Sequence, residues 1–215
     1  MPVRLLNRVR NFIYKNRLVV KAGNRLHLPV STEQMMKRVT LKLGGKNNRI
    51  VFGEDVLIGD CEIRLDGENN LIEIGDHVRF KSGKIYLRHT SGQHIRIGAG
   101  TTVEGAYLLV DEAASITIGA DCMFSTNIQI RTGDKHSILD AATGERINYA
   151  RDINIADRVW LGRSVQVLKG AVLRPETVVG TCALVSNSFD EGNCVLAGVP
   201  ARIVRRGIRW DRELL

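Results

Sequence analysis

The segment from Asp152 to Ser186 carries the clearest signal of the fold and reads DINIADRVWLGRSVQVLKGAVLRPETVVGTCALVS. An aliphatic residue recurs at every sixth position, in the order Ile155, Leu161, Val167, Leu173, Val179 and Val185. A helix repeats every 3.6 residues and a simple strand every two, so neither keeps a strict period of six. The period is typical of a β-solenoid, in which each short strand turns one aliphatic side chain toward the axis before the chain turns a corner.

The same phase continues toward the N-terminus. Coils are predicted to start at apolar residues, often followed by glycine, in the order Phe52, Ile74, Ile97, Ile118, Ile155 and Leu173. Further inward positions are predicted six or twelve residues later, at Ile58, Phe80, Tyr86, Val103, Leu109, Phe124 and Ile130. The steps between coil starts are 22, 23, 21, 37 and 18 residues. A coil of three hexads needs 18 residues. The steps of 21 to 23 residues therefore indicate widened corners, and the step of 37 residues indicates an insertion at about 131–152.

Composition sets the scale of the molecule. The chain has 215 residues, of which 44% are hydrophobic, which is enough for one domain with a real core. No run approaches the ~20 apolar residues of a membrane span, and the N-terminal segment lacks the apolar core of a signal peptide. We therefore expect a cytoplasmic protein. The four cysteines, with no C-x-x-C pair, are predicted to be reduced core or turn residues rather than disulfides or zinc ligands.

The net charge of +8 is concentrated at the two ends of the chain. Residues 1–46 carry +10 and residues 201–215 carry +3, whereas residues 47–200 carry −5. An anionic polymer, or the anionic inner face of the cytoplasmic membrane, would meet these ends. A solvated, solubilising face is the equal alternative. No aromatic residues interleave the basic ones, so no nucleic-acid partner is expected.

Three segments follow from these patterns. Residues 1–50 are predicted to be a basic lead-in. An amphipathic helix over 1–22 is predicted to cap the solenoid, pack between subunits or lie on a membrane, and residues 23–50 are predicted to be irregular. Residues 51–205 form the solenoid. Residues 206–215 are predicted to form a short helix that helps to cover the open end, since an exposed sheet edge must be covered.

Several motifs together resemble the left-handed β-helix hexapeptide-repeat acyltransferases: the aliphatic-Gly-x-x-small-x hexad, DRVWLGRSVQVLKGAVL at 157–173 and AGVPARIVRR at 197–206. The insertion TGDKHSILDAATGERINYARDI is similar to the loop of the branch that O-acetylates sugars and bacterial surface polysaccharides, including polysialic-acid capsules. The resemblance implies an all-β, left-handed parallel β-helix, a homotrimer with acetyl-CoA sites between neighbouring subunits, and acetyl transfer to a saccharide hydroxyl.

Acetyl transfer to a hydroxyl needs a base, because a neutral alcohol is a poor nucleophile. His136 is the candidate base: it is the only histidine in the insertion, it lies in a polar segment without core periodicity, and it matches the Asp-x-His of the family. An unperturbed histidine, with a pKa of ~6.5, is mainly neutral at pH 7. The alternative is a plain surface histidine. Asp134 either orients the imidazole or is a solvated loop acid.

Trp160 is the second candidate catalytic residue. It precedes an inward residue and should therefore point out of the solenoid, where a large aromatic ring is costly unless covered. The resemblance implies that the ring packs against the acetyl thioester and the pantetheine arm, beside the histidine. The alternative is burial in a subunit interface.

Residues that could bind the acceptor are polar and lie in or near the insertion: Asn127, Asp134, Lys135, Asp140, Arg146 and Asn148. An arginine such as Arg146 can hold a sugar carboxylate by paired hydrogen bonds. The equal alternative for Asn127 is a corner residue with a left-handed backbone. The equal alternative for Asp140, Arg146 and Asn148 is a role in the turns of the insertion. Nothing in the insertion distinguishes an acidic sugar from a neutral hexose.

For CoA, the resemblance points to the outer face of the last coils and the C-terminus: Trp160, Gly162, Ser164, Lys169, Gly180, Thr181, Ser186, Pro200, Arg202 and Arg205. The basic members of this set could neutralise the CoA phosphates. Alternatively, the two arginines merely cap backbone carbonyls.

One other function is rejected, and two remain as alternatives. Some hexapeptide solenoids bind zinc through three histidines, but His89 and His94 lack a third ligand at coil spacing, so no metal is expected. An N-acetyltransferase for an amino-sugar nucleotide would share the fold, and a non-catalytic scaffold or binding module would not bind acetyl-CoA.

Overall fold

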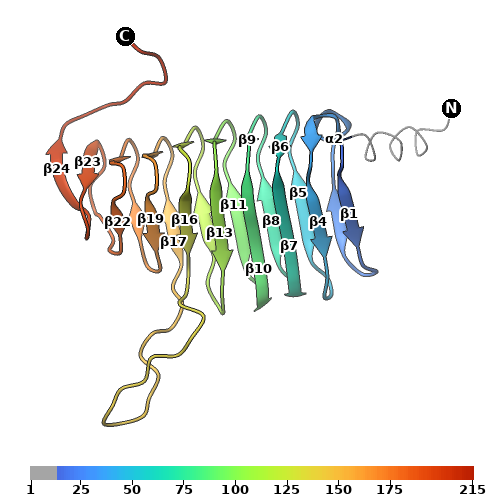
Figure 1. The fold of residues 1–215 in the computed structure, drawn as a ribbon, viewed down its shortest axis with the longest axis horizontal. Coiled ribbons are helices and arrows are strands. Elements are labelled where there is room, and N and C mark those ends of the chain that lie inside the picture. Colours follow the sequence, from blue (N-terminus) through green and yellow to red (C-terminus); the bar gives the residue numbers. More distant parts are fainter. Residues whose placement is uncertain (1–13) are drawn as a thin grey trace.

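The computed structural model describes residues 14–215, except for the side chain of His89, and these residues form a parallel β-solenoid (Figure 1). Strands of successive coils stack into three sheets of eight, seven and nine strands. Sheet A contains β1 (Arg17–Val20), β4 (Thr40–Leu43), β7 (Cys61–Glu68), β10 (Gly83–Ser91), β13 (Ala106–Val110), β16 (Ile128–Arg131), β19 (Gln166–Leu168) and β22 (Leu184–Val185).

The other two sheets complete the triangular coil. Sheet B contains β2 (Arg25–His27), β5 (Arg49–Phe52), β8 (Leu71–Ile74), β11 (His94–Ile97), β14 (Ile116–Ile118), β17 (Ile153–Ile155) and β20 (Val172–Leu173). Sheet C contains β3 (Met36–Lys37), β6 (Leu57–Gly59), β9 (Arg79–Phe80), β12 (Thr102–Val103), β15 (Met123–Phe124), β18 (Trp160–Leu161), β21 (Val178–Val179), β23 (Cys194–Ala197) and β24 (Arg202–Arg206).

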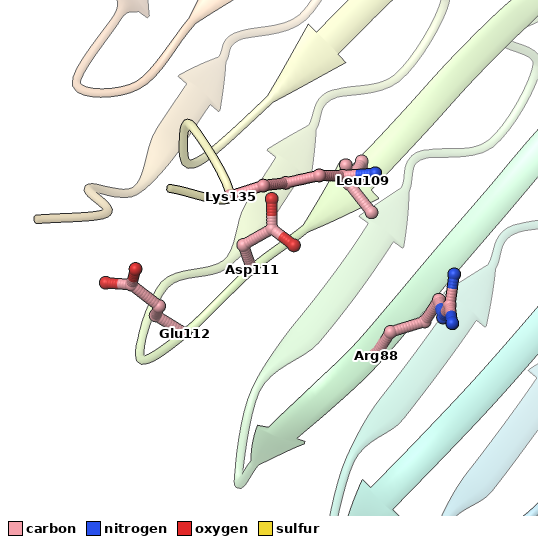
Figure 2. A pocket seen from close by; sticks show the side chains of 5 residues that line it. All are labelled: Arg88, Leu109, Asp111, Glu112 and Lys135. Atoms are coloured by element: carbon pink, nitrogen blue, oxygen red, sulfur yellow. The ribbon is translucent and has the colours of Figure 1, made fainter. Parts of the chain in front are cut away.

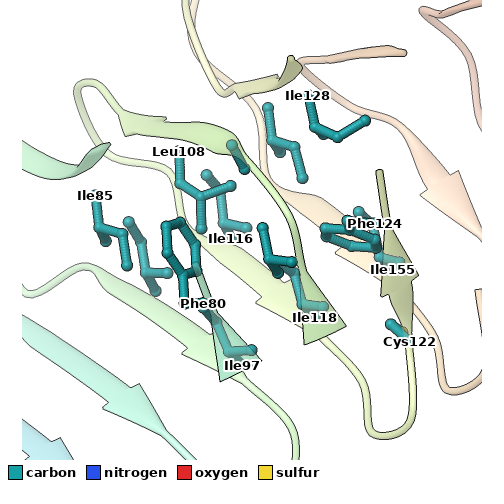
Figure 3. Packing of buried hydrophobic residues seen from close by; sticks show 14 of the residues in the cluster. Phe80, Ile85, Ile97, Leu108, Ile116, Ile118, Cys122, Phe124, Ile128 and Ile155 are labelled. Atoms are coloured by element: carbon teal, nitrogen blue, oxygen red, sulfur yellow. The ribbon is translucent and has the colours of Figure 1, made fainter. Parts of the chain in front are cut away.

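The predicted coil starts are confirmed by the register of sheet B. Each one pairs with the next across a parallel ladder, in the order Phe52, Ile74, Ile97, Ile118, Ile155 and Leu173. All six side chains are buried and belong to one continuous core, part of which Figure 3 shows. Stacking identical positions in this way lets each coil bury its apolar face against its neighbours.

Two predicted inward positions are wrong. On β10 the side chains of Ile85 and Leu87 are buried in the core, and the partly exposed Tyr86 lies between them. On β13, Leu108 and Val110 point inward, and Leu109 pairs with Tyr86 on the outer face. The cause is a corner between sheets C and A that is one residue shorter here than in the later coils. A one-residue shift turns a strand's side chains to the opposite face.

The solenoid begins earlier than predicted. Strands β1 to β5 continue the three sheets back to Arg17, so the part of the lead-in after residue 16 forms coils rather than irregular chain. The predicted helix over 1–22 falls partly on residues 1–13, outside the described residues, and Arg17–Val20 is strand. A helix, α2 (Val30–Met35), occupies the corner before β3 and interrupts the hexad phase. Because of this interruption, the period of six does not reveal these coils in the sequence.

The predicted C-terminal helix over 206–215 is also wrong. Strand β24 pairs antiparallel with β23 and covers that edge of sheet C, so no helix is needed there. The tail then returns along the outside of the coils. There Arg212 contacts the side chain of Asp121 at 2.9 Å and that of Thr102 at 2.9 Å.

The predicted insertion is confirmed. It lies between β16 and β17, at the corner from sheet A to sheet B, and projects from the solenoid as a long arm (Figure 1). The regular coils on both sides of it stack directly, because Ile118 pairs with Ile155 across the gap in sequence. The arm is therefore an addition to an otherwise uninterrupted solenoid.

Candidate active site

The distal part of the arm is a hairpin closed by its own backbone. Leu139 and Arg146 form an antiparallel bridge, and the amide of Ile147 donates to the Ile138 carbonyl at 2.9 Å. At the tip, the Asp140 carboxylate accepts hydrogen bonds from the amides of residues 142 and 143, each at 2.9 Å. These bonds lower the pKa of Asp140 and commit its side chain to the turn.

Asn148 fastens the two sides of the arm near its base. This buried side chain donates to the Asp134 carboxylate at 2.8 Å and to the His136 carbonyl at 2.8 Å. Its oxygen accepts from the amide of Ile138 at 2.7 Å. The backbone on both sides of the candidate base is thus held by one amide side chain.

Two ion pairs tie the arm to the solenoid. The Lys169 ammonium contacts the Asp134 carboxylate and donates to the Asn148 carbonyl at 3.1 Å. The Arg146 guanidinium contacts the Glu112 carboxylate. Each cation lowers the pKa of its partner carboxyl by hydrogen bonding to the charged form. Lys169 and Arg146 therefore anchor the arm, and neither guanidinium nor ammonium is left pointing freely at a ligand.

His136 is exposed on the arm. Its backbone carbonyl is held by Asn148, whereas the Asp134 carboxylate pairs with Lys169 and Asn148 instead of with the imidazole. The ring is thus presented to solvent from a fixed stretch of backbone, which is the arrangement that a base acting on an incoming hydroxyl requires.

Trp160 lies outside the core at the start of β18 and is 37% exposed. Its ring centroid is 6.1 Å from that of Trp210, with the planes inclined at 53°. Trp210 is fixed by Arg158, whose guanidinium lies over the ring at 4.9 Å and donates to the Trp210 carbonyl at 2.8 Å. The C-terminal tail therefore covers one side of Trp160 and leaves the rest of its ring accessible.

A single chain does not bring His136 and Trp160 together. His136 lies on the arm at the corner from sheet A to sheet B, and Trp160 follows the next corner, beyond strand β17. Three extended residues span about 10 Å, and the arm projects away from the body (Figure 1). The expectation that the two side chains are neighbours is therefore not met within one chain.

The corner between sheets C and A gathers another group of candidates. Asn127 donates to the Ser164 hydroxyl at 3.1 Å, and both residues have left-handed backbones, with φ of 59° and 58°. Asn127 thus lies among the CoA candidates rather than in the arm. In the next coil, a Cβ on Gly162 would lie 2.9 Å from the Thr181 amide nitrogen, so close stacking of coils requires glycine there.

The remaining CoA candidates lie at the end of the solenoid. The turn that contains Pro200 stacks on β22, because the Leu184 amide donates to the Gly198 carbonyl at 3.0 Å. Arg202 and Arg205 are exposed on β24, and Thr181 is exposed at the neighbouring corner. Ser186 follows β22 and is partly buried. Thr181, Pro200, Arg202 and Arg205 are thus exposed near the C-terminal end of the solenoid.

A cavity of about 340 Å³ lies beside the base of the arm and was missed in the sequence. Figure 2 shows the side chains that line it: Arg88, Leu109, Asp111, Glu112 and Lys135. Of these, only Lys135 was predicted as a site residue. The alternation of inward and outward side chains along β10 and β13 would have placed Arg88 and Leu109 on the outer face, but only with the correct register.

Neither a metal cluster nor a membrane-spanning helix occurs in the described part of the chain. No three side chains of His, Cys, Asp or Glu within residues 14–215 gather as metal ligands would. His94 contacts the Thr117 hydroxyl at 3.1 Å, and burial lowers its pKa. No helix among these residues is long and apolar enough to cross a membrane.

The chain is similar to several known proteins. It is 37% identical to the polysialic acid O-acetyltransferase of Neisseria meningitidis over 185 residues, which are 86% of this chain and 85% of that protein. It is 35% identical to the polysialic acid O-acetyltransferase of Escherichia coli O1:K1 over 57% of this chain and 40% of that protein. No family model matches the sequence.

Solved structures agree with these relatives. The polysialic acid O-acetyltransferase OatWY superposes with a TM-score of 0.84 at 33% identity, over 93% of this chain and 92% of that one. The polysialic-acid-specific acetyltransferase NeuO superposes with a TM-score of 0.80 at 30% identity, over 92% and 89%. The fold and these relatives define the class: the protein is an acetyltransferase built on a left-handed parallel β-helix, as predicted. Within that class, the chain belongs to the family of the polysialic acid O-acetyltransferases.

Proposed function

We propose that this protein transfers an acetyl group from acetyl-CoA to a hydroxyl of a bacterial surface polysaccharide, with His136 as the general base. The observation that carries the proposal is the position of His136. It is the histidine of the single long arm, and Asn148 fixes its backbone at 2.8 Å. The names of the relatives, polysialic acid O-acetyltransferases, support a capsular polysaccharide as the acceptor.

The chemistry follows from a neutral imidazole. The imidazole takes the hydroxyl proton as the hydroxyl oxygen attacks the thioester carbonyl. Collapse of the tetrahedral intermediate breaks the carbon–sulfur bond, and the imidazolium returns the proton to the departing thiolate. The products are an acetyl ester and free CoA.

We further propose that Trp160 of a neighbouring subunit completes the site in a homotrimer. The separation of the two residues within one chain requires a second copy if both act on one substrate. The arm also exposes four large apolar side chains, each between 55% and 62% exposed: Ile138, Leu139, Ile147 and Tyr149. An exposed apolar group of this size on a projecting hairpin is suited to contact with another subunit.

CoA is proposed to lie along the corner between sheets C and A and the end surface formed by Thr181, Pro200, Arg202 and Arg205. The two arginines are exposed and can neutralise phosphates. Lys169 is left out of this site, because its ammonium is paired with Asp134 in the arm.

The test is release of thiol from acetyl-CoA in the presence of candidate polysaccharides. His136→Ala is expected to lower kcat by about 10²- to 10⁴-fold, the usual contribution of a general base. His27→Ala, an exposed histidine on β2 far from the arm in sequence, is the matched control and should keep full activity. Full activity of His136→Ala would overturn the mechanism, and a product stable to mild base would indicate an amide and hence N-acetyl transfer.

A further inference from the structure

The cavity beside the arm lies on the outer face of sheet A. Tyr86, Leu109 and Arg131 form one outward row across β10, β13 and β16. Arg88 stands two residues further along β10, Asp111 directly follows the end of β13, and Lys135 reaches the same place from the arm (Figure 2). Leu109 provides an apolar wall, and the charged side chains surround it.

Three charged groups here have unmet hydrogen-bonding capacity. Nε of Arg88, Nε of Arg131 and Oδ2 of Asp111 are all buried, and none has a hydrogen-bond partner among the described side chains and backbone. Buried polar atoms are normally paired, because an unmade hydrogen bond away from water is unfavourable. Burial also raises the pKa of Asp111, although the cations Lys135, Arg131 and Arg88 oppose that shift. The group therefore has hydrogen-bonding capacity that a ligand could use.

Glu112 does not supply the missing partner. Its carboxylate is occupied by the Arg146 guanidinium and by the Ala150 amide at 3.2 Å. The same ion pair removes Arg146 from the set of residues that could hold a ligand carboxylate. That role falls to Arg88 and Lys135, which line the cavity. Arg131, the ladder neighbour of Leu109, adds a third positive charge close to Asp111.

We propose that this cavity binds one acidic sugar unit of the acceptor, with the sugar carboxylate held by Arg88 and Lys135, attracted also by the nearby charge of Arg131, and a sugar hydroxyl or amide N–H donated to Asp111. A neutral hexose offers no anion to the three cations. A fully ionised phosphate offers no donor to Asp111. A sugar carboxylic acid supplies both the anion for the cations and the hydroxyl or amide donor for Asp111. The volume lies within the range of small-molecule sites.

The inference rests on the proposed function and deepens it. Lys135 directly precedes His136, so one wall of the cavity belongs to the same stretch of the arm as the proposed base. The unit bound there is either the one that is acetylated or its neighbour in the polymer. The polar residues Asp134, Arg146 and Asn148 of the arm are occupied in anchoring it. The proposed cavity beside the arm would supply recognition of an acidic polymer instead.

The experiment compares polysialic acid with the same polymer after chemical reduction of its carboxylates to alcohols, using the full-length protein. Direct binding is measured by calorimetry with oligosaccharides of each polymer, and transfer is measured as KM and kcat. Arg88→Gln and Lys135→Gln should each weaken binding of the acidic form, and raise its KM, by about ten- to a hundredfold. Their KM for acetyl-CoA should be unchanged, and wild-type protein should bind the reduced form far more weakly.

Two controls make the result decisive. Arg96→Gln removes an exposed arginine of sheet B that pairs with Glu73, and it should bind the acidic form as wild type does. Lys135 is exposed on the arm, so its variant tests the site even if Arg88→Gln is poorly folded. Unchanged binding in Lys135→Gln and in a folded Arg88→Gln, or wild-type protein that does not bind the acidic form, overturns the proposal. Binding without acetyl transfer would instead contradict the proposed function alone.

Discussion

At the scale of single residues, the arm depends on one buried amide. The Asn148 side chain makes four hydrogen bonds: it donates to Asp134 and to the His136 carbonyl, and it accepts from the Ile138 amide and the Arg146 guanidinium. In sequence it is an unremarkable asparagine in a polar loop. Its burial makes it the residue that sets where His136 stands.

Asn148→Ala is therefore expected to lower stability and kcat together. Removing the side chain leaves the His136 carbonyl and the Ile138 amide without this partner, which costs about 1–3 kcal/mol where such groups stay buried. Thermal unfolding and thiol-release kinetics measure both effects. Asn154→Ala, an exposed asparagine on β17, is the control, and equal behaviour of the two variants would show that the arm does not position the base.

Two glycines of successive coils give a matched pair at the same scale. Alanine at Gly162 would place its Cβ 2.9 Å from backbone atoms of the next coil, whereas at Gly180 the nearest atom is 3.4 Å away. Gly162→Ala should lower the free energy of unfolding by about 1–3 kcal/mol through overpacking. Gly180→Ala should cost clearly less in the same denaturant titration. The reverse order would contradict the stacking described here.

At the scale of elements, the arm is attached by electrostatics rather than by a core. Its four large apolar side chains are exposed, and the ion pairs Lys169–Asp134 and Arg146–Glu112 hold its base. Such an element opens independently of the coils, because local stability follows local burial.

Lys169→Met should therefore loosen the arm without affecting CoA. Amides of residues 134–148 are expected to exchange with deuterium faster, and KM for acetyl-CoA should stay within about twofold of wild type. An exposed lysine elsewhere on the solenoid, Lys84, provides the control as Lys84→Met. A large rise in KM for acetyl-CoA with unchanged deuterium exchange would instead indicate that Lys169 binds the cofactor.

Acid should loosen the same element. The pKa values of Asp134 and Glu112 are lowered by their cations, so their stabilising effect is present above the ordinary carboxyl pKa of about 4 and is lost as the pH falls through the lowered values. Arm amides should thus lose protection, relative to amides of sheet B, at a pH below about 4. Protection that is independent of pH across this range would contradict an ionic anchor.

At the scale of the whole molecule, the separation of His136 from Trp160 makes the assembly testable. A mixture of His136→Ala and Trp160→Ala chains, co-refolded in equal amounts, should regain activity if each site takes one residue from each of two neighbours. In a cyclic trimer, random assembly pairs intact residues at roughly a quarter of the sites. Chains of one variant alone should remain inactive, and a mixture that is equally inactive would place the whole site within one subunit.

Much of the fold was predictable because the hexad is a local signal. The side chains of Ile155, Leu161 and Val167 face the axis wherever the period of six holds, and the insertion shows itself as a break in that period. The same search failed at Tyr86 and Leu109, where a corner is one residue shorter, and before Phe52, where α2 interrupts the phase. The cytoplasmic location, the trimer and the individual CoA contacts stay predictions.

The solenoid, the arm and the candidate base follow from the sequence alone, because each depends on residues that are close together in the chain. The contact of Asn148 with His136, the anchoring of the arm by Lys169, and the cavity shared by Arg88 and Asp111 are visible only in the folded chain. The cause is the stacking of coils. Side chains that point outward meet residues about one turn away, and the length of each corner, which no local period specifies, decides which ones they meet.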